Sequence, residues 1–277
     1  MLIRYGFDIE IEISQPTTLV TAMDVHPDRR ASIIRETPFS VSQDVPVETF
    51  VDAFGNVSRR VTALPGALTM RLDGVARDSG KPDPVDWAAQ AIPPASLPAN
   101  VLPYLLGSRY CETDLLAGLA WSNFGAIEGG WAKVQAICDF VNRSLVFSYP
   151  QARATRTASE AYREATGVCR DFTHLAVTLC RCLNIPARYC NGYLGDIGVD
   201  PDPAPMDFNA WFEAYIGGRW YTFDARHNQP RIGRILIARG RDAADVAMIT
   251  SFGPHLLKRF TVVTEEVQQA DAFTMAA

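Results

Sequence analysis

The first ninety residues alternate between apolar and polar positions. Ile9, Ile11 and Ile13 are separated by polar residues, the period of two that is expected of a strand with one buried face. Gly55 and Asn56 supply the residues of a hairpin turn. Further strands are expected over residues 18–23, 48–53 and 68–75. Short strands separated by turn signals predict a small antiparallel β-sandwich at the start of the chain.

A proline-rich segment follows, with the sequence AIPPASLPANVLP over residues 91–103. Its four prolines fix the backbone and remove hydrogen-bond donors, so the segment is expected to be a stiff linker. We therefore expect an N-terminal β domain over residues 1–92, the linker over 93–103, and a second domain over 104–277 that carries its own C-terminal strands.

Beyond the linker the apolar spacing becomes helical. The segment 131–141 carries apolar side chains three and four residues apart, the spacing of one helix face. Another helix is expected after Gly167, and it should end near Asn184 because Pro186 forbids its continuation. Shorter helices are expected over residues 114–121 and 157–165, and strands over 187–194, 208–216, 219–224, 234–238 and 260–265. Helices followed by strands, without strict alternation, predict an α+β fold.

The composition argues against several classes of protein. Of the 277 residues 48% are hydrophobic, as in a folded globule. The 26 basic residues against 31 acidic residues give a net charge of −5, which offers no basic field to nucleic acid. No apolar run is long enough to span a membrane, and the first residues do not resemble a secretory signal. We expect a cytoplasmic protein with neither nucleic acid nor a membrane as partner.

Six cysteines and four histidines are the residues that suggest chemistry. Six cysteines in this length are too few for a disulfide scaffold, which fits a reducing compartment. The sequence contains neither a CxxC nor an HExxH motif, and it lacks the glycine-rich motifs that bind phosphate. We therefore expect no metal and no cofactor.

Cys169 begins the helix that is expected after Gly167. The first backbone N–H groups of a helix lack partners and its dipole is positive there, and both effects favour a thiolate. The same N–H groups can stabilise an oxyanion. Cys138 and Cys180 lie on apolar helix faces and Cys190 lies in a strand, where a buried and inert thiol is expected. Cys169 is therefore the candidate nucleophile.

A hairpin is expected over residues 208–226, with Gly217-Gly218 as its turn. The turn pairs Ile216 with Arg219 and makes Asn209 and Asp224 diagonal neighbours, within reach of a common partner. One face of the hairpin carries Asn209, Trp211, Glu213, Thr222, Asp224 and Arg226. The other face looks like core and carries Phe208, Phe212, Tyr221 and Phe223.

Three motifs, GVCRDF, NIPARYCNGY and NAWFEAYIGGRWYTFDA, follow one another before residue 226. In this order they resemble the transglutaminase-like superfamily of cysteine enzymes. The β-rich start, with its DAFGN segment, resembles the N-terminal domain of bacterial members. The resemblance implies a papain-like α+β core with a Cys–His–Asp triad, in which Cys169 is the nucleophile and Asp224 the orienting carboxylate. It also implies a peptide or protein substrate, whose amide carbonyl the cysteine attacks before the acyl group passes to an amine or to water.

The sequence departs from the family pattern at the base. The family motif has histidine directly before Ala210, and this chain has Asn209. Asparagine cannot take a proton from a thiol or deliver one to a leaving amine. The loss of positioned acid–base help typically costs roughly 10²–10⁴ in rate.

Two histidines are possible substitutes for the base. His227 follows Asp224 by three residues and can reach the site if the chain bends at Arg226. His174 lies five residues after Cys169, which puts it about 140° away around the helix. A hydrogen-bonded structural histidine is the alternative in each case. Two further histidines lie outside the matched motifs and are given no catalytic role: His26 and His255.

Two residues beside the expected site are candidates for substrate binding. Trp211 can form a wall of the acyl pocket, although tryptophan in such a hairpin is commonly part of the core. Arg170 can bind a substrate carbonyl, and a solvated side chain is the alternative.

Two functions remain open at this point. The first is acyl transfer or amide and peptide hydrolysis through a Cys169 thiolate. The second is a non-catalytic module that holds a peptide or protein on the same fold, an interpretation that Asn209 favours. A metal site built from histidine and cysteine has no ligand spacing to support it.

Overall fold

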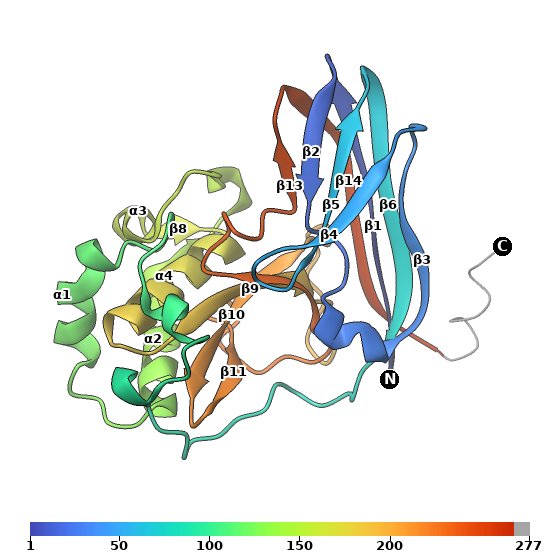
Figure 1. Cartoon of the computed structure of the whole chain (residues 1–277). Coiled ribbons are helices and arrows are strands. Elements are labelled where there is room, and N and C mark those ends of the chain that lie inside the picture. The colour runs from blue at the N-terminus through green and yellow to red at the C-terminus, as the bar shows by residue number, and fades with distance from the viewer. Residues whose placement is uncertain (269–277) are drawn as a thin grey trace.

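The structure, a computed structural model, describes residues 1–268. A layer of helices, a central four-stranded sheet and a β-sandwich lie side by side across the molecule (Figure 1). Within residues 1–268 no helix has the length and apolar character needed to cross a bilayer.

The β-sandwich consists of two four-stranded antiparallel sheets. The first has the order β14-β1-β6-β3, with the strands β1 (Leu2–Ile13), β3 (Ile33–Val41), β6 (Gly66–Arg77) and β14 (His255–Val267). The second has the order β13-β2-β5-β4, with the strands β2 (Thr17–Thr21), β4 (Val47–Val51), β5 (Val57–Ala63) and β13 (Ile249–Ser251). The alternation in β1 is as expected, since Ile9, Ile11 and Ile13 are all buried. The strand β3 was not expected from the sequence.

The C-terminal strands lie in the N-terminal sandwich and not in the second domain, where the sequence had placed them. β14 pairs with β1 along its whole length, from Leu2 opposite Val267 to Ile13 opposite His255. β13 pairs with β2 in the other sheet. This arrangement makes β1 a central strand with β6 on one edge and β14 on the other, so the backbone N–H and C=O groups of both edges are hydrogen-bonded. Figure 1 shows the red C-terminal strand beside the blue N-terminal one.

The central sheet separates the helices from the sandwich. Its order is β11-β10-β9-β12, with the strands β9 (Ala187–Tyr193), β10 (Asn209–Ile216), β11 (Arg219–Phe223) and β12 (Ile235–Gly240). Its hairpin has the expected register, with Ile216 opposite Arg219 and Phe212 opposite Phe223. One core lies between this sheet and the helices, and a second lies between the sheet and the sandwich.

The helical layer surrounds one buried helix. Within the described residues, the α-helices of this layer are α1 (Thr113–Phe124), α2 (Trp131–Ser144), α3 (Ala158–Glu164) and α4 (Cys169–Cys182). Every residue from 171 to 181 is buried, because α4 packs against the other helices and against β9 and β10. Before α4, two short parallel strands, β7 (Val146–Phe147) and β8 (Thr166–Gly167), fix the chain that leads into Cys169. These helices and antiparallel sheets confirm the α+β class.

The proline-rich segment contains short 3₁₀ turns at Pro94–Ser96 and Leu102–Leu105. The chain already lies against the helical layer before this segment begins. The carbonyl of Ala89 accepts hydrogen bonds from the N–H groups of Gly130 and Trp131, and the Tyr221 hydroxyl donates to Asp86 over 2.7 Å. We call the segment between β6 and the proline-rich segment, from residue 78 onward, the arm. These hydrogen bonds attach the arm to the second domain.

Candidate active site

Cys169 is the first residue of α4, at the place that the sequence predicted. The carboxylate of Asp171 accepts a hydrogen bond from the Val168 N–H over 2.9 Å and so caps the helix. Asp171 is itself held by a bond of 3.1 Å from Arg156. Gly167 leaves room for this carboxylate, because a Cβ there would lie 2.5 Å from the Cβ of Asp171. These contacts fix the position of the thiol at the helix start.

The Cys169 thiol opens onto a cavity of about 670 Å³. The cavity runs between the second domain and the inner face of the β-sandwich. Tyr189 and Ala210 line it from the central sheet, while Ile9 and Leu257 line it from β1 and β14. A cavity of this size lies in the range that proteins use to bind small molecules or side chains.

The surroundings hold the Cys169 thiol in its protonated form. Burial raises the pKa of Cys169 to about 11, and the carboxylates of Asp207 and Asp224 act in the same direction. The positive charge of Arg226 and the backbone N–H of Ala210 oppose this rise without overcoming it. The helix start alone predicted a thiolate, and the structure differs because removal of the thiol from water outweighs the helix dipole.

Asn209 lies at the start of β10, beside this cavity. Its Oδ1 accepts a hydrogen bond of 3.2 Å from the guanidinium of Arg226. Its Nδ2 donates to the carbonyls of Leu194 and Asp207 over 3.4 and 3.3 Å. The amide is thus held by the second domain at the position where the sequence motif requires a base.

Asp224 follows β11 and is buried. Oδ1 accepts the backbone N–H groups of Arg226 and His227 over 3.1 and 3.0 Å. Oδ2 accepts from Nδ1 of His227 over 2.8 Å and from Arg234 over 2.9 Å. Burial on its own would raise the pKa of Asp224, but the charge of Arg234 and the bonds from His227 hold it well below the usual range of an aspartate. Asp224 is ionised, and both of its oxygens are occupied.

The chain does bend at Arg226, so that His227 turns back towards Asp224. His227 and Asn209 line a small second cavity of about 40 Å³. Cys169 lies on the larger cavity, which Asn209 and Asp207 also line. His227 is therefore hydrogen-bonded to Asp224, while Asn209 is the residue that shares the larger cavity with Cys169.

His174 lies in the core, away from the Cys169 cavity. Its Nε2 accepts a hydrogen bond of 3.1 Å from the Ala243 N–H, and its ring stacks on Tyr110 with the centroids 5.1 Å apart. Burial lowers the pKa of His174 well below its ordinary value, and the charges of Arg170 and Arg181 add to this effect. His174 is a neutral structural histidine, as the helical spacing indicated.

The guanidinium of Arg170 is occupied by the protein itself. It donates to the backbone carbonyls of Arg153, Ala154 and Arg156 over 2.9, 2.5 and 2.9 Å. It also lies over the ring of Tyr110, 4.9 Å from the centroid. Arg170 thus holds the loop before α3. Both terminal nitrogens of its guanidinium donate to backbone carbonyls of that loop rather than to a substrate carbonyl.

Trp211 faces away from the Cys169 cavity. It is buried with Cys190 and Leu236, and the guanidinium of Arg234 lies 4.9 Å above its ring. Since Arg234 is also paired with Asp224, Trp211 helps to position the guanidinium that binds this carboxylate. Trp211 does not line the Cys169 cavity as expected, although Asn209 on the same face of β10 does, because two residues further along the strand the tryptophan packs on Cys190 and Leu236.

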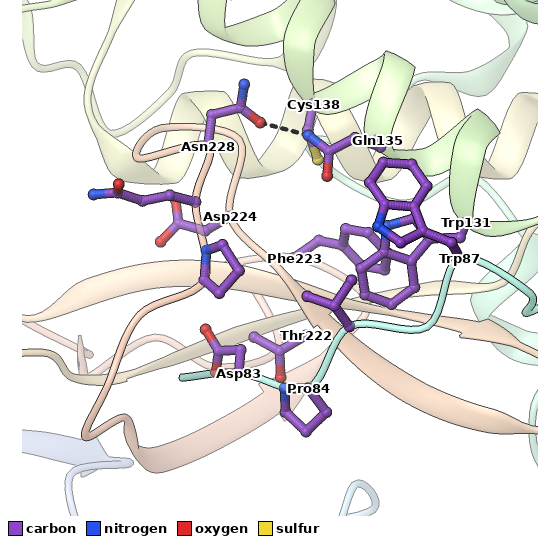
Figure 2. Close-up of a pocket in the computed structure, with 13 residues that line it drawn as sticks. Asp83, Pro84, Trp87, Trp131, Gln135, Cys138, Thr222, Phe223, Asp224 and Asn228 are labelled. Carbon is purple, nitrogen blue, oxygen red and sulfur yellow. Dashed lines mark hydrogen bonds between the residues drawn. The ribbon is translucent and has the colours of Figure 1, made fainter. Parts of the chain in front are cut away.

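Asp224 also borders a separate cavity of about 220 Å³, on the side of α2 and the arm (Figure 2). Figure 2 shows Trp87 and Trp131 on one side of this cavity and Asp224 on the other, with Asn228 accepting a hydrogen bond of 2.9 Å from Gln135. Cys169 does not line it. The cysteine that lines this cavity is Cys138, which is buried, and burial raises the pKa of its thiol. The cavity therefore lacks a thiol that could attack a substrate amide.

Comparisons with known proteins agree with this geometry. A sequence model of the transglutaminase-like superfamily matches residues 125–225, which include Cys169, Asn209 and Asp224. A solved structure from Cytophaga hutchinsonii, named as a candidate cysteine protease, matches with a TM-score of 0.83 and 31% identity, covering 97% of this chain and 91% of that one. The chain belongs to the transglutaminase-like superfamily. The resemblance of the sequence motifs, and the transglutaminase-like core with its β-rich N-terminal region, are thereby confirmed.

Mycobacterial relatives match less of the chain. An uncharacterized protein of Mycobacterium leprae is 34% identical over 91 residues, which cover 32% of this chain and 32% of that protein. The match therefore spans about a third of the length of that relative. An uncharacterized protein of Mycobacterium tuberculosis is 28% identical over 221 residues, covering 70% of this chain and 68% of that protein.

Four features of this transglutaminase-like site were missed by the sequence reasoning: the charges of Arg226 and Asp207 beside Cys169, the pairing of Arg234 with Asp224, and the position of His255. His255 lines the Cys169 cavity at its far end, because β14 returns to β1. It pairs with Ile13, roughly 13 Å along β1 from Ile9. The acidic Asp207, two residues before Asn209, was visible in the sequence but belonged to no motif.

No group of three or more metal-ligating side chains comes together within residues 1–268. All six cysteines are free, and only Cys169 and Cys182 are partly exposed. The groups that act on the Cys169 thiol are the carboxylates of Asp207 and Asp224, the guanidinium of Arg226 and the backbone N–H of Ala210.

Proposed function

We propose that this protein transfers acyl groups from peptide or protein amides through a thioester on Cys169, and that water or an amine takes up the acyl group. The observation that carries the proposal is the position of Cys169, a partly exposed residue at the start of α4 that lines a cavity of about 670 Å³. Membership of the transglutaminase-like superfamily and the name of the Cytophaga relative support it.

In the proposed reaction the Cys169 sulfur adds to the amide carbonyl while the thiol proton passes to the carboxylate of Asp207. The first N–H groups of α4 have no acceptor within the helix and face the developing oxyanion. The C–N bond then breaks, the leaving amine takes the proton, and the acyl group remains as a thioester. Addition of water or of a second amine to the thioester releases the acyl group and returns the thiol.

Asp207 is assigned the role of proton acceptor because it is the acidic residue that lines the cavity together with Cys169. Burial raises the pKa of Asp207, and the Phe208 N–H and the charge of Arg226 act against this rise. A carboxylate with a raised pKa is a stronger base than an ordinary aspartate. A carboxylate remains a weaker base than an imidazole towards a thiol. Turnover is therefore expected to be slow, by roughly 10²–10⁴ relative to a site with a positioned histidine.

A second candidate function is the binding of a peptide or protein without turnover. The hydrogen bond between Asn209 and Arg226 favours it, since the position of the base is filled by a pair that moves no proton. The pKa of Cys169, raised by burial to about 11, is also typical of a thiol that does not react.

The two functions separate in one experiment. The wild-type protein and the Cys169→Ala variant are incubated with a library of fluorogenic peptide amides, and intact mass is measured during the reaction. The proposal predicts slow amide cleavage by the wild type, an added acyl mass on Cys169, and loss of both in the variant. Binding of peptides with no acyl mass and no cleavage would support the second function, and cleavage that survives in Cys169→Ala would refute the role of the thiol.

A further inference from the structure

The part of the Cys169 cavity that lies farthest from the thiol is built by the β-sandwich. In the β1–β14 ladder Ile9 is opposite Phe260 and Ile11 is opposite Leu257, so these four side chains share the inner face of the sheet. All four line the cavity. The two isoleucines are buried, but Leu257 is 54% exposed and Phe260 is 38% exposed. An apolar inner face is thus open towards the active-site thiol.

The opposite wall is apolar as well. The segment that leads from β12 to β13 contributes Val246, Ala247 and Met248 to the cavity, and β13 contributes its first residue, Ile249. From the second domain, Phe208 packs against Phe260 with the ring centroids 5.9 Å apart. A ligand in this part of the cavity would therefore contact carbon on both sides.

The polar groups of the cavity are mostly engaged within the protein. Asn191 donates to the Val246 carbonyl over 2.9 Å and accepts the Ala238 N–H over 3.0 Å. The guanidinium of Arg170 donates to three backbone carbonyls. Asp207 lines the cavity together with Cys169 and is assigned to the reaction, and His255 pairs with Ile13 at the other end of the β1 wall. Of the charged side chains that line the cavity, Arg170 and Asp207 are thus already engaged, and burial of an unpaired substrate charge is strongly unfavourable.

The sandwich wall is held in register with the thiol. The side chain of Asn56, in the turn between β4 and β5, donates to the carbonyl of Arg239 and accepts its N–H, with both bonds 2.8 Å long. Arg239 lies in β12, and β12 is hydrogen-bonded to β9 of the central sheet. The sheet that forms the wall also packs directly on the central sheet, since the rings of Tyr5 in β1 and Tyr193 in β9 have their centroids 5.3 Å apart. The apolar wall therefore shares one packed core with the central sheet.

We infer that this cavity is the acyl-side specificity site, and that it selects substrates with a bulky apolar side chain next to the reacting carbonyl. The inference rests on the proposed function, and it names the substrate class of that site: apolar peptides in preference to peptides with a charged or short polar residue at this position. A cavity of about 670 Å³ accepts an aromatic side chain with room for a neighbouring residue. The N-terminal sandwich, and not the catalytic domain alone, supplies the selectivity.

The test uses the thiol itself as the reporter and needs no amide turnover. Cys169 is alkylated by iodoacetamide or by N-benzyl iodoacetamide; in both reactions the sulfur bonds to the methylene carbon and iodide leaves. Rates are read at the Cys169 peptide by mass spectrometry. Cys182 provides a reference in the same sample, because it is partly exposed and does not line the cavity.

The expected result is a ratio of benzyl to parent rates at Cys169 that exceeds the ratio at Cys182 about fivefold or more, as burial of one or two methylene equivalents would give. Leu257→Ser and Phe260→Ser should each lower this ratio, which is taken within each variant and so corrects for any change in the iodoacetamide rate itself. Leu256→Ser is the matched control, because Leu256 is 58% exposed, lies opposite Glu12 and does not line the cavity.

Equal ratios at Cys169 and Cys182 would overturn the inference, as would an equal loss in the Leu256 and Leu257 variants. The two inner-face variants are assessed separately, so one that fails to fold leaves the other as the test. Failure of the proposed function shows itself differently, as an absence of acyl mass on Cys169 while the alkylation preference persists.

Discussion

The imidazole of His227 donates to the carboxylate of Asp224 over 2.8 Å, while Cys169 lies on a cavity that neither of these two residues lines. Asn209 lines both this cavity and the smaller one beside His227, and it is bonded to Arg226. Besides His227, the carboxylate of Asp224 accepts hydrogen bonds from Arg234 and from two backbone N–H groups. The carboxylate therefore also holds the chain around it in place. The site thus has a histidine and an aspartate in contact, with Asn209 at the motif position of the base.

The reactivity of Cys169 should rise with pH without a plateau in the neutral range. Burial places the thiol pKa at about 11, so the thiolate fraction grows about tenfold for each pH unit below that value. The rate of alkylation by iodoacetamide, read at the Cys169 peptide, measures this directly. A plateau near the value of about 8.5 that a free cysteine shows would contradict the account of the site.

Two charges beside Cys169 should move that profile in opposite directions. Asp207→Asn removes a negative charge and is expected to lower the pKa of the thiol by about one unit. Arg226→Met removes a positive charge and is expected to raise it by a similar amount. The same alkylation profile serves for both variants. A shift of both in one direction would show that charge does not govern this thiol.

Replacement of Asp224 should cost stability at neutral pH. Asp224→Asn removes one of the two carboxylates that pair with the buried guanidinium of Arg234, the other being Asp83, and the expected loss is about 1.5–3 kcal/mol of unfolding free energy. Asp28→Asn is the control, because the side chain of Asp28 is 58% exposed and its pair with Arg239 should contribute about 1 kcal/mol or less. Urea unfolding measures both, and a loss in Asp224→Asn no larger than in the control would contradict the assignment.

The same variant gives a pH dependence with a definite sign. The folded pKa of Asp224 is depressed: burial would raise it, but Arg234 and His227 outweigh that effect. A depressed carboxyl pKa adds stability that is present above the unfolded value of about 3.9 and is lost as the pH falls through the folded value. The stability difference between wild type and Asp224→Asn should therefore shrink below about pH 4. A difference that stays constant into acid would indicate that lost packing, not lost charge, causes the effect.

Gly167 should tolerate no side chain. In Gly167→Ala the new Cβ would lie 2.5 Å from the Cβ of Asp171, so the helix cap must move, at an expected cost of about 1–3 kcal/mol. Gly118→Ala is the control, since a Cβ there in α1 meets nothing within 4 Å and should stabilise the helix by about 0.5–1 kcal/mol. Thermal unfolding of the two variants should shift in opposite directions, and equal shifts would refute the steric argument.

Local sequence signals predicted the parts of the fold that local interactions determine. The turn at Gly217-Gly218 fixed the register of the hairpin, since the pairing of Ile216 with Arg219 depends on the two residues between them. The position of Cys169 at a helix start was predicted for the same reason. Pairing over long separations was not predictable: no pattern within residues 255–267 states that β14 pairs with β1. The cavity wall and the place of His255 depend on that pairing.

The electrostatics of the site show the same division. The helix dipole acts over the first turn and could be inferred from the position of Cys169 alone. Burial of the thiol between the second domain and the sandwich acts against the dipole and raises the pKa of Cys169. This burial depends on residues such as Ile9 that lie far away in the sequence. The alternation along β10 predicted that Trp211 and Phe212 face opposite ways, but not which face belongs to the cavity.

The central claim is that Cys169 carries out acyl transfer without an imidazole at position 209, and amide turnover by Asn209→His tests it most directly. A histidine at this position supplies the missing acid–base group, so kcat/KM for an apolar peptide amide should rise about 10²-fold, near the lower end of the usual gain because Asp224 is already occupied. The gain should vanish when Cys169→Ala is added. Wild-type turnover that is unchanged by Asn209→His, or that persists without Cys169, would contradict the account.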